Sequence, residues 1–445
     1  MALYLIAALM LFSVSCRNEY EPVFDEPANE RVEAVVDEYR NRLINASDGW
    51  KAFIYPGSEG GYMFFFEFNA DGTVTMVSDF NDSTAEQPMD GTFAVKALQR
   101  PTLVFDTYSY IHLLSDPDGI VNNGPVGQGL ESDFEFAFTH ASADSVTLEG
   151  IKNNTPITFV PASAAEREGF LAGTIKDSRN TASVYFAANS NPFLTTSGNT
   201  VFPVGINDAT KILTLFYLDE DLGIQKLNLP FSYSAGGILV QKNISVPGLS
   251  FQEMLYDANQ ENYYVINNDQ KLFLQHSSSF ISFPQALPPL VQVLGTQYKT
   301  IFIDPALSSN NSAAFNSIYD EAAQKVEVEM AAYDLTLGEV ILTFESPGSA
   351  IISYIVYQNN NDFACNFYYD IAVTQAGRLD FSFTGMNENA ELARNSLLPL
   401  VNYFENEPLT MEYYADTNVG ELLAGVSPQS EEDNYFYGIL LEETF

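Results

Sequence analysis

The chain has 445 residues and a formal net charge of −39, with 58 Asp and Glu residues against 19 Lys and Arg. A surface this acidic repels phosphate backbones and anionic lipid, which argues against a nucleic-acid partner and against membrane adhesion by charge. Hydrophobic residues make up 46% of the chain and aromatic residues 13%. This is enough apolar material for the cores of two or three domains.

The opening segment, residues 3–14, is almost wholly apolar and ends just before Cys16. It is too short for a transmembrane helix, which needs about 18 residues or more, but it suits a secretory h-region of about 7–15 residues. Ser13 and Ser15 supply small residues beside the cysteine, as in a bacterial lipobox, although no Lys or Arg precedes the segment. The sequence predicts a lipoprotein signal peptide and lipidation of Cys16. The alternative is a buried N-terminal helix or strand.

A polar tether and a helix are expected next. Residues 16–28 are polar and contain two prolines. Asn29 can then cap a helix that runs to about Ala46. Apolar residues follow the helical period and predict one packing stripe, which consists of Val32, Val35, Val36, Tyr39 and Leu43.

From Trp50 onward the apolar residues recur with a period of two, which predicts strands. Eight short runs follow one another with short links, and Asn69–Gly72 predicts a hairpin turn. Such a meander can stay open or close into a small lipocalin-like barrel. The runs are WKAFIYP, GYMFFFEFN, TVTMVSDF, GTFAVKA, TLVFDTYS, DFEFAFTH, SVTLEGIK and TPITFVP.

A second helix is expected after Ser163, whose spacing to Glu166 matches a capping box. A further series of strands is predicted from about Val184 to Gln275, and the Pro-rich stretch Ser282–Gln292 predicts a junction. The strands of this series are KILTLFYLD, IQKLNLPFSYS, GILVQKNIS, NYYVINN and KLFLQH.

The last part of the chain is expected to repeat the pairing of helices with strands. Helices are predicted near 313–323 and 389–404. The strands are GEVILTFES, AIISYIVYQ, NFYYDIAVT, RLDFSFTG, LTMEYYA and YFYGILL.

The expected fold is therefore mostly β with a few helices, an α+β class made of two or three tandem antiparallel β-meander lobes. The predicted divisions are a signal peptide (1–15), a tether (16–28), an N-terminal helix-plus-meander domain (29–162), a middle helix-plus-β domain (163–290) and a C-terminal β domain with helices (291–445).

Motifs that carry catalysis are scarce. None of the three histidines, His112, His140 and His276, has another within five residues, and HExxH is absent. No nucleophile elbow, P-loop or dinucleotide-binding motif occurs. The sequence therefore predicts no catalytic residue, no metal and no cofactor, although a site assembled only in space leaves no such motif. The second cysteine, Cys365, lies in an aromatic strand and is expected to be buried packing.

The richest polar cluster lies within residues 105–119 and is the candidate binding site. The structural alternative is favoured, because Asp-Pro-Asp-Gly is turn chemistry. Calcium is a further alternative, but neither this loop nor residues 218–223 have EF-hand spacing. The candidate residues are Asp106, Tyr108, His112, Asp116 and Asp118.

Three stretches resemble a family of uncharacterised Bacteroidota lipoproteins, classed as a domain of unknown function: DGWKAFIYPGSEGGYMFFFEFNADGTVTMVSD, LVFDTYSYIHLLSDP and GLESDFEF. The resemblance is specific over about residues 47–160. It implies a lipobox and genes beside SusC/SusD-type uptake pairs, but no activity, so no catalytic residue follows from it. The matching residues include Gly49, Trp50, Pro56, Gly60, Gly61, Tyr62, Asp71, Gly72, Asp106, Thr107, Tyr108, His112, Asp116, Pro117 and Asp133–Phe136.

These observations favour a lipoprotein held at the bacterial outer membrane through Cys16, on the cell surface or the periplasmic face. The leading hypothesis is a non-catalytic accessory or binding component of a nutrient uptake system, with a glycan, a peptide or a SusC/SusD-type transporter as its partner. One alternative is a hydrolase whose site assembles around His112. The other is a purely structural envelope lipoprotein.

Overall fold

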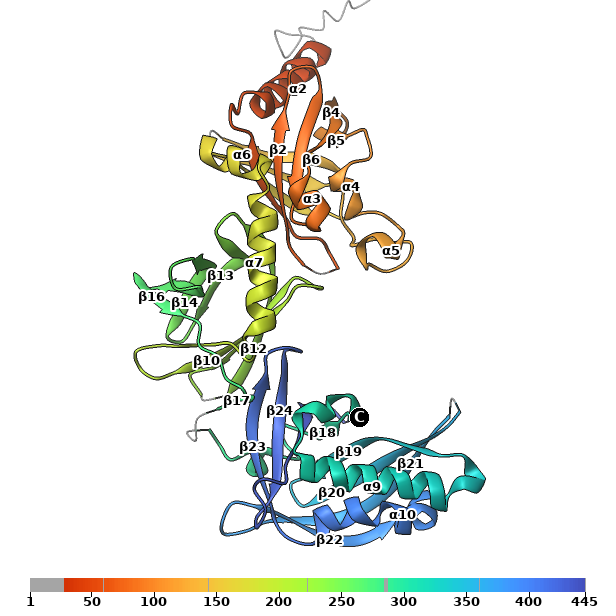
Figure 1. The fold of residues 1–445 in the computed structure, drawn as a ribbon. Helices are drawn as coiled ribbons and strands as arrows, with labels where there is room; N and C mark the ends of the chain where they lie inside the picture. Colours follow the sequence, from red (N-terminus) through yellow and green to blue (C-terminus); the bar gives the residue numbers. More distant parts are fainter. Residues whose placement is uncertain are drawn as a thin grey trace, which may run out of the picture.

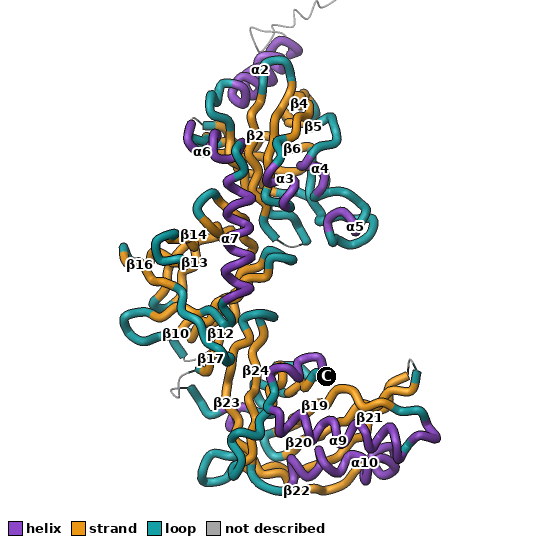
Figure 2. Tube along the Cα trace, in the orientation of Figure 1, coloured by secondary structure: helices purple, strands orange, loops and turns teal. Residues whose placement is uncertain are grey.

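The computed structural model describes residues 28–444 except 59, 143, 222, 284–286 and 360. The predicted signal peptide, Cys16 and nearly all of the tether lie outside the described residues. The chain folds into three β-sheets that follow one another along an elongated body (Figure 1). Figure 2 shows that strands dominate and that helices lie against them. The predicted class, mostly β with a few antiparallel lobes, is confirmed.

The helices lie before, between and inside the sheets. The α-helices are α2 (Ala28–Ile44), α3 (Asp82–Glu86), α4 (Tyr110–Leu113), α5 (Gly119–Asn122), α6 (Ala164–Leu171), α7 (Thr174–Ala188), α8 (Leu290–Val293), α9 (Ala313–Glu329) and α10 (Glu388–Glu405), and the 3-10 helices are η1 (Pro305–Asn310) and η2 (Ala331–Tyr333).

The first lobe is a closed barrel of eight antiparallel strands, and each corresponds to a run that the sequence predicted. The barrel closes because the first strand pairs with both the second and the eighth. The strands are β1 (Trp50–Ile54), β2 (Tyr62–Phe68), β3 (Thr73–Ser78), β4 (Met89–Ala97), β5 (Pro101–Phe105), β6 (Glu135–Ala141), β7 (Val146–Gly150) and β8 (Pro156–Pro161).

Aromatic side chains fill the barrel. The ring of Phe66 lies 5.5 Å from Phe64, 5.7 Å from Phe68 and 5.4 Å from both Phe105 and Phe159, centroid to centroid. An eight-stranded barrel is just wide enough to be filled by side chains. The interior is therefore a packed core.

Helix α2 closes one end of this lobe. Trp50 is buried, and its indole Nε1–H donates to the backbone oxygen of Leu43 at 2.9 Å. The helix begins one residue before the expected cap, Asn29. Only part of the predicted stripe packs, because Val32 and Val35 are 47% and 38% exposed. These two valines lie in the first half of α2, and the side chains that pack on the barrel core, Val36, Tyr39 and Leu43, come from the rest of the helix.

The second lobe is an eight-stranded meander whose ends meet at an antiparallel bridge between Phe193 and Gln275. The sequence missed β9, β10 and β14. The lobe's strands are β9 (Phe193–Thr195), β10 (Val201–Asn207), β11 (Ile212–Leu218), β12 (Ile224–Ser234), β13 (Gly237–Val246), β14 (Leu249–Asp257), β15 (Asn262–Asn267) and β16 (Gln270–Phe273).

The prediction that strands resume near Val184 is wrong. Val184 lies in α7 and is 71% exposed. The buried side chains of this segment, Ile175, Ser178, Ala182 and Tyr185, follow the helical period instead. The β-branched and aromatic residues near its end resemble a strand locally, but they lie on different sides of a helix that packs on β12 and β13.

The third lobe is a nine-stranded sheet with α9 and α10 packed against it (Figure 1). Strand β23, which lies between β17 and β22, also pairs with β24, the last strand of the order. Both predicted helices and six predicted strands are present, whereas β17, β18 and β24 were missed. The strands are β17 (Ile281–Ser282), β18 (Thr300–Ile303), β19 (Thr336–Ser346), β20 (Ser349–Gln358), β21 (Asn361–Val373), β22 (Leu379–Met386), β23 (Leu409–Asp416), β24 (Glu421–Pro428) and β25 (Phe436–Leu441).

A buried ion pair joins the first two lobes. The Nζ atom of Lys211 lies 2.7 Å from a carboxylate oxygen of Asp79, and the side chains are 3% and 0% exposed. The carboxylate also accepts backbone N–H groups from Met63, at 2.8 Å, and from Tyr233, at 2.7 Å. Burial lowers the pKa of the Lys211 ammonium, and the charge of Asp79 opposes this shift. One carboxylate thus binds groups from both lobes.

Arg179 of α7 extends this junction. Its guanidinium donates to the backbone oxygen of Asp79 at 2.7 Å and lies over the ring of Tyr233, at 5.3 Å from the centroid. The Tyr233 hydroxyl in turn donates to Asp208 at 2.8 Å. Helix α7 therefore spans the first two lobes and binds both.

The second and third lobes approach closely where β10 meets the turn after β23. A side chain at Gly205 would place its Cβ 2.2 Å from the backbone oxygen of Thr417, so only glycine fits there. An ion pair between Lys226 and Glu421, at 3.1 Å, lies at the same junction.

We expect Lys211→Met to lower the free energy of unfolding by about 3–5 kcal/mol, because it leaves the Asp79 carboxylate buried without a countercharge. Lys271→Met is the matched control. It removes a surface ion pair with Asp257 and should lower stability far less than Lys211→Met, because solvent screens the pair. Urea denaturation measures both variants, and equal small losses would contradict the importance of the buried pair.

Candidate functional site

The sequence-predicted cluster lies in the loop between β5 and β6, which also carries α4 and α5. The structure brings four of its residues together: Tyr108, His112, Asp116 and Asp118. Asp106 is separate, because its carboxylate forms an exposed ion pair with Lys96 of β4 at 2.9 Å.

His112 is held between two aromatic rings. Its ring stacks on Phe134 at 4.7 Å and on Tyr108 at 5.5 Å, centroid to centroid. The backbone N–H of Ser109 donates to His112 Nδ1 at 3.1 Å. Burial lowers the pKa of the imidazole below its ordinary value. The ring is therefore a packing element that uses one nitrogen to cap the first turn of α4.

The acidic residues of the loop form the turn that the sequence favoured. Asp116 accepts the hydroxyl of Tyr108 and, at 2.9 Å, the backbone N–H of Asp118. These two hydrogen bonds lower the pKa of the Asp116 carboxyl, the tyrosine contributing most. Asp118 caps α5 by accepting the N–H of Ile120 at 2.9 Å. The oxygens are thus engaged by neighbouring donors of the same loop.

Asp133, from the stretch that carries the family resemblance, is also structural. Its buried carboxylate accepts the backbone N–H of Lys152 at 2.8 Å and the hydroxyl of Thr155 at 2.9 Å. A Cβ at Gly150 would lie 1.9 Å from this carboxylate, so Gly150 leaves the space that Asp133 occupies. The pair organises the turn between β7 and β8.

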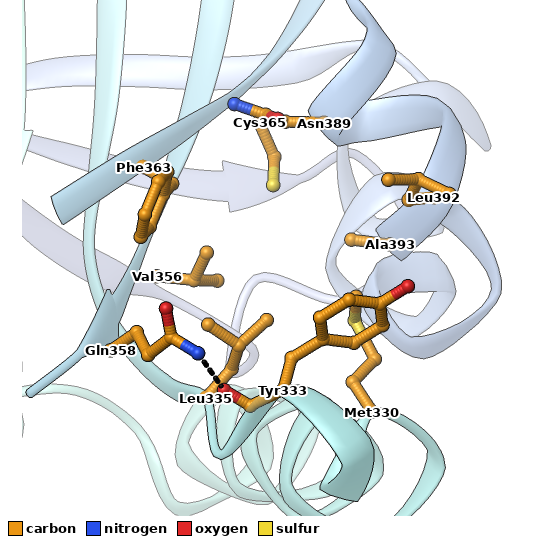
Figure 3. Close-up of a pocket in the computed structure, with 10 residues that line it drawn as sticks. All are labelled: Met330, Tyr333, Leu335, Val356, Gln358, Phe363, Cys365, Asn389, Leu392 and Ala393. Carbon is orange, nitrogen blue, oxygen red and sulfur yellow. Dashed lines mark hydrogen bonds between the residues drawn. The ribbon is translucent and has the colours of Figure 1, made fainter. Parts of the chain in front are cut away.

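A pocket of about 260 Å³ lies in the third lobe, where α10, η2 and the β20–β21 hairpin meet (Figure 3). Its walls are mainly apolar, and strands contribute one side while α10 contributes the other. Lining residues are Met330, Tyr333, Leu335, Val356, Gln358, Phe363, Cys365, Asn389, Leu392 and Ala393.

Two lining side-chain amides each donate one hydrogen bond within the protein. The Gln358 amide donates to the Tyr333 backbone oxygen at 2.6 Å, and the Asn389 amide donates to the Ala364 backbone oxygen at 3.2 Å. Cys365 is a buried free thiol, and burial raises its pKa to about 11. A thiol with this pKa is a poor nucleophile at neutral pH, so the pocket is suited to binding apolar groups.

Sequence reasoning missed this pocket because its residues come from four separate elements. One signal was present in α10, where Leu392 interrupts the polar face of the helix and is 67% exposed. The buried stripe of α10 contains Ala390, Ala393, Leu397 and Leu400 instead. An exposed leucine off the packing stripe is a sign of an apolar surface.

Among the described residues, no group of three or more His, Cys, Asp or Glu side chains is placed to hold a metal ion. The helices of the same residues include none that is long and apolar enough to span a membrane.

The fold and the two candidate sites define a three-lobed, mostly β protein with a structured polar loop on its barrel and an apolar pocket in its third lobe. The chain belongs to the family described as domain of unknown function (DUF4302), whose model matches residues 20–258. This range covers the barrel, α6, α7 and most of the second sheet, but not the pocket. None of the curated proteins compared with the chain matches it.

We expect His112 to titrate with a midpoint below its ordinary pKa of 6.5. Because its folded pKa is lowered, the unfolded chain takes up the proton first, so this group reduces stability as the pH falls below about 6.5. NMR titration of the imidazole Cε1–H measures the midpoint. Phe134→Ala should raise it by removing one of the covering rings, and a native midpoint at or above 6.5 would contradict the stacked arrangement.

We expect Cys365 to react slowly with N-ethylmaleimide in the native protein. A rise in its pKa from 9.0 to about 11 means about a hundredfold less thiolate at pH 8, and burial reduces access further. Mass spectrometry of the peptide that contains Cys365 measures the rate. Denaturation should restore ordinary reactivity, whereas fast native labelling would show that the thiol is open to solvent.

Proposed function

We propose that this protein is a lipid-anchored binding component of a nutrient uptake system at the bacterial outer membrane, and that it acts without catalysis. The lipobox-like sequence that ends at Cys16 and the polar stretch after it support an anchor. Two or more acyl chains hold a protein stably on a membrane, each buried CH₂ contributing about 0.8 kcal/mol. Such an anchor supplies the attachment that a net charge of −39 opposes.

The observation that carries the proposal is where the pocket lies relative to the N-terminal helix. Helix α2, which follows the tether, is at one end of the elongated body, and the lobe that holds the pocket is at the other (Figures 1 and 2). A lipid at Cys16 would therefore keep the apolar pocket away from the membrane surface and open to a soluble ligand.

The rigid junction between the first two lobes supports the same role. The buried pair of Asp79 and Lys211, together with Arg179, holds the barrel and the second sheet in one arrangement. A fixed arrangement of these two lobes keeps the barrel, which follows the tether, from folding back on the second sheet. The resemblance to lipoproteins encoded beside SusC/SusD-type pairs supports a transporter of that type as the partner.

We expect labelled palmitate to enter the protein in cells and Cys16→Ala to abolish the label, because Cys16 is the residue that receives the lipid. Cys365→Ala is the matched control, since it removes the other cysteine and should leave labelling unchanged. Autoradiography of the immunoprecipitated protein measures incorporation. Unchanged labelling of Cys16→Ala would contradict the anchor.

We also expect the protein, extracted from membranes in mild detergent, to co-purify with a SusC/SusD-type transporter identified by mass spectrometry. Cys16→Ala should lose this association, because the unanchored chain no longer shares a membrane with the transporter. Recovery of the lipidated protein alone, together with an absence of peptide and glycan binding by calorimetry, would overturn the uptake role.

A further inference from the structure

The two ends of the second sheet are joined by a short seam, formed by residues 190–193 and residues 274–277. The backbone N–H of Phe193 donates to the backbone oxygen of Gln275 at 2.9 Å, and the N–H of Gln275 donates back at 2.8 Å. The N–H of Ser277 adds a hydrogen bond of 3.3 Å to the other side of the seam. The pairing is an isolated bridge and not a full strand pair, so few hydrogen bonds need to break for it to open.

The seam is also the place where the chain leaves the second lobe. Residues 278–280 follow it, and β17 then pairs with β23 of the third lobe (Figure 1). The start of this connection is thus held by the second lobe and its end by the third. The seam therefore fixes the point from which the connection to the third lobe begins.

His276 lies within the seam and binds α7 through its ring. The Nε2 atom is 2.7 Å from the hydroxyl oxygen of Tyr185, and the two rings are 5.3 Å apart, centroid to centroid. The same hydroxyl is hydrogen-bonded to the side-chain oxygen of Asn262. Through these contacts the seam is attached to the helix that spans the first two lobes.

The hydrogen bonds of this group have a definite direction. The Asn262 amide nitrogen donates to the backbone oxygen of Leu274 at 3.0 Å, so the amide oxygen faces Tyr185 and can only accept. Burial raises the pKa of Tyr185 to about 12, so the phenol keeps its one proton and donates it to Asn262. The Tyr185 oxygen must then accept from His276. The neutral imidazole is therefore the Nε2–H tautomer.

A further proton on His276 would have to bind Nδ1. This nitrogen is buried and has no hydrogen-bond partner among the described residues. A buried N–H group without an acceptor is costly, and a charged one more so. Burial accordingly lowers the pKa of the imidazole below its ordinary value. The proton is therefore bound more readily when the ring has left this site.

The surroundings of His276 offer no charge that would offset this cost. Residues 180–195 and 272–283 contain no Asp, Glu, Lys or Arg. The side chains that pack around Tyr185 from β14 and β15 are tyrosines, Tyr256 and Tyr263, at 6.5 and 4.9 Å between ring centroids. The charged residues of the neighbouring strands, Asp257 and Lys271, pair with each other at 3.0 Å.

We propose that His276 is a pH-sensitive latch that closes the seam of the second lobe. At neutral pH the uncharged imidazole donates to Tyr185 and the seam is closed. As the pH falls, the ring takes up a proton at Nδ1 and leaves its site, and the seam opens. Opening releases the start of the connection to the third lobe, so this connection becomes longer in acid. The latch does not depend on what the third-lobe pocket binds.

The direct test is amide hydrogen exchange of the full chain at pH 7.5 and pH 5.0, corrected for the intrinsic effect of pH on exchange. Protection of Phe193, Gln275 and Ser277 should fall by about three- to thirtyfold at pH 5.0. The upper limit applies to a group of ordinary pKa 6.5 that binds a proton only in the open state. Strand β20 is the internal reference and should change by less than about twofold, because the third lobe has no histidine.

Two variants assign the effect to His276. His276→Gln keeps a side-chain N–H that can donate to Tyr185 but does not titrate, so protection of the seam should be equal at the two pH values within about twofold. His140→Gln is the matched control, because His140 is exposed and lies in the barrel. It should retain the full effect of pH. Circular dichroism checks that both variants fold.

NMR of the imidazole nitrogens gives a second measurement that needs no variant to remain stable. The signals of His276 should show the Nε2–H tautomer at neutral pH and a titration midpoint below 6.5. An Nδ1–H tautomer, or a midpoint at or above 6.5, would overturn the proposal. So would equal protection of the parent seam at both pH values, a similar loss in β20, or an undiminished loss in His276→Gln.

Discussion

The buried carboxylate of Asp79 is the interaction on which the arrangement of the first two lobes depends. It accepts a backbone N–H from β2 and another from β12, and its charge is balanced by Lys211. A buried charge is costly unless it is paired and hydrogen-bonded. Because the partners come from two lobes, the cost is met only when the barrel and the second sheet are docked in this one way.

The family match contains this interaction. The matched range, residues 20–258, includes the barrel, helix α7 and both residues of the ion pair. The two lobes of this unit cannot be separated without leaving the Asp79 carboxylate without its Lys211 partner. The third lobe meets the second through a close backbone approach at Gly205 and an exposed ion pair, and it carries the pocket.

The polar loop and the pocket show how differently the two candidate sites could be predicted. The loop residues Tyr108, His112, Asp116 and Asp118 are neighbours in sequence, so their association was predictable, and so was their turn chemistry. The pocket is formed by residues 330–335, the β20–β21 hairpin and α10. No local pattern relates these segments, because the distances between them depend on how the helices pack on the sheet.

The sequence by itself determined the mostly β class, the eight strands of the first meander, the helix capped at Ser163 and the helix that begins near Asn389, because alternation, helical period and capping are local properties of the chain. Only the tertiary structure decided that the barrel closes, that the segment around Val184 is helical, and that Asp79 meets Lys211. Each of these results depends on contacts between residues distant in sequence. Where such contacts bury side chains, burial overrides local propensity. The placement of an apolar pocket in the third lobe, at the end of the body opposite α2, was decided in the same way.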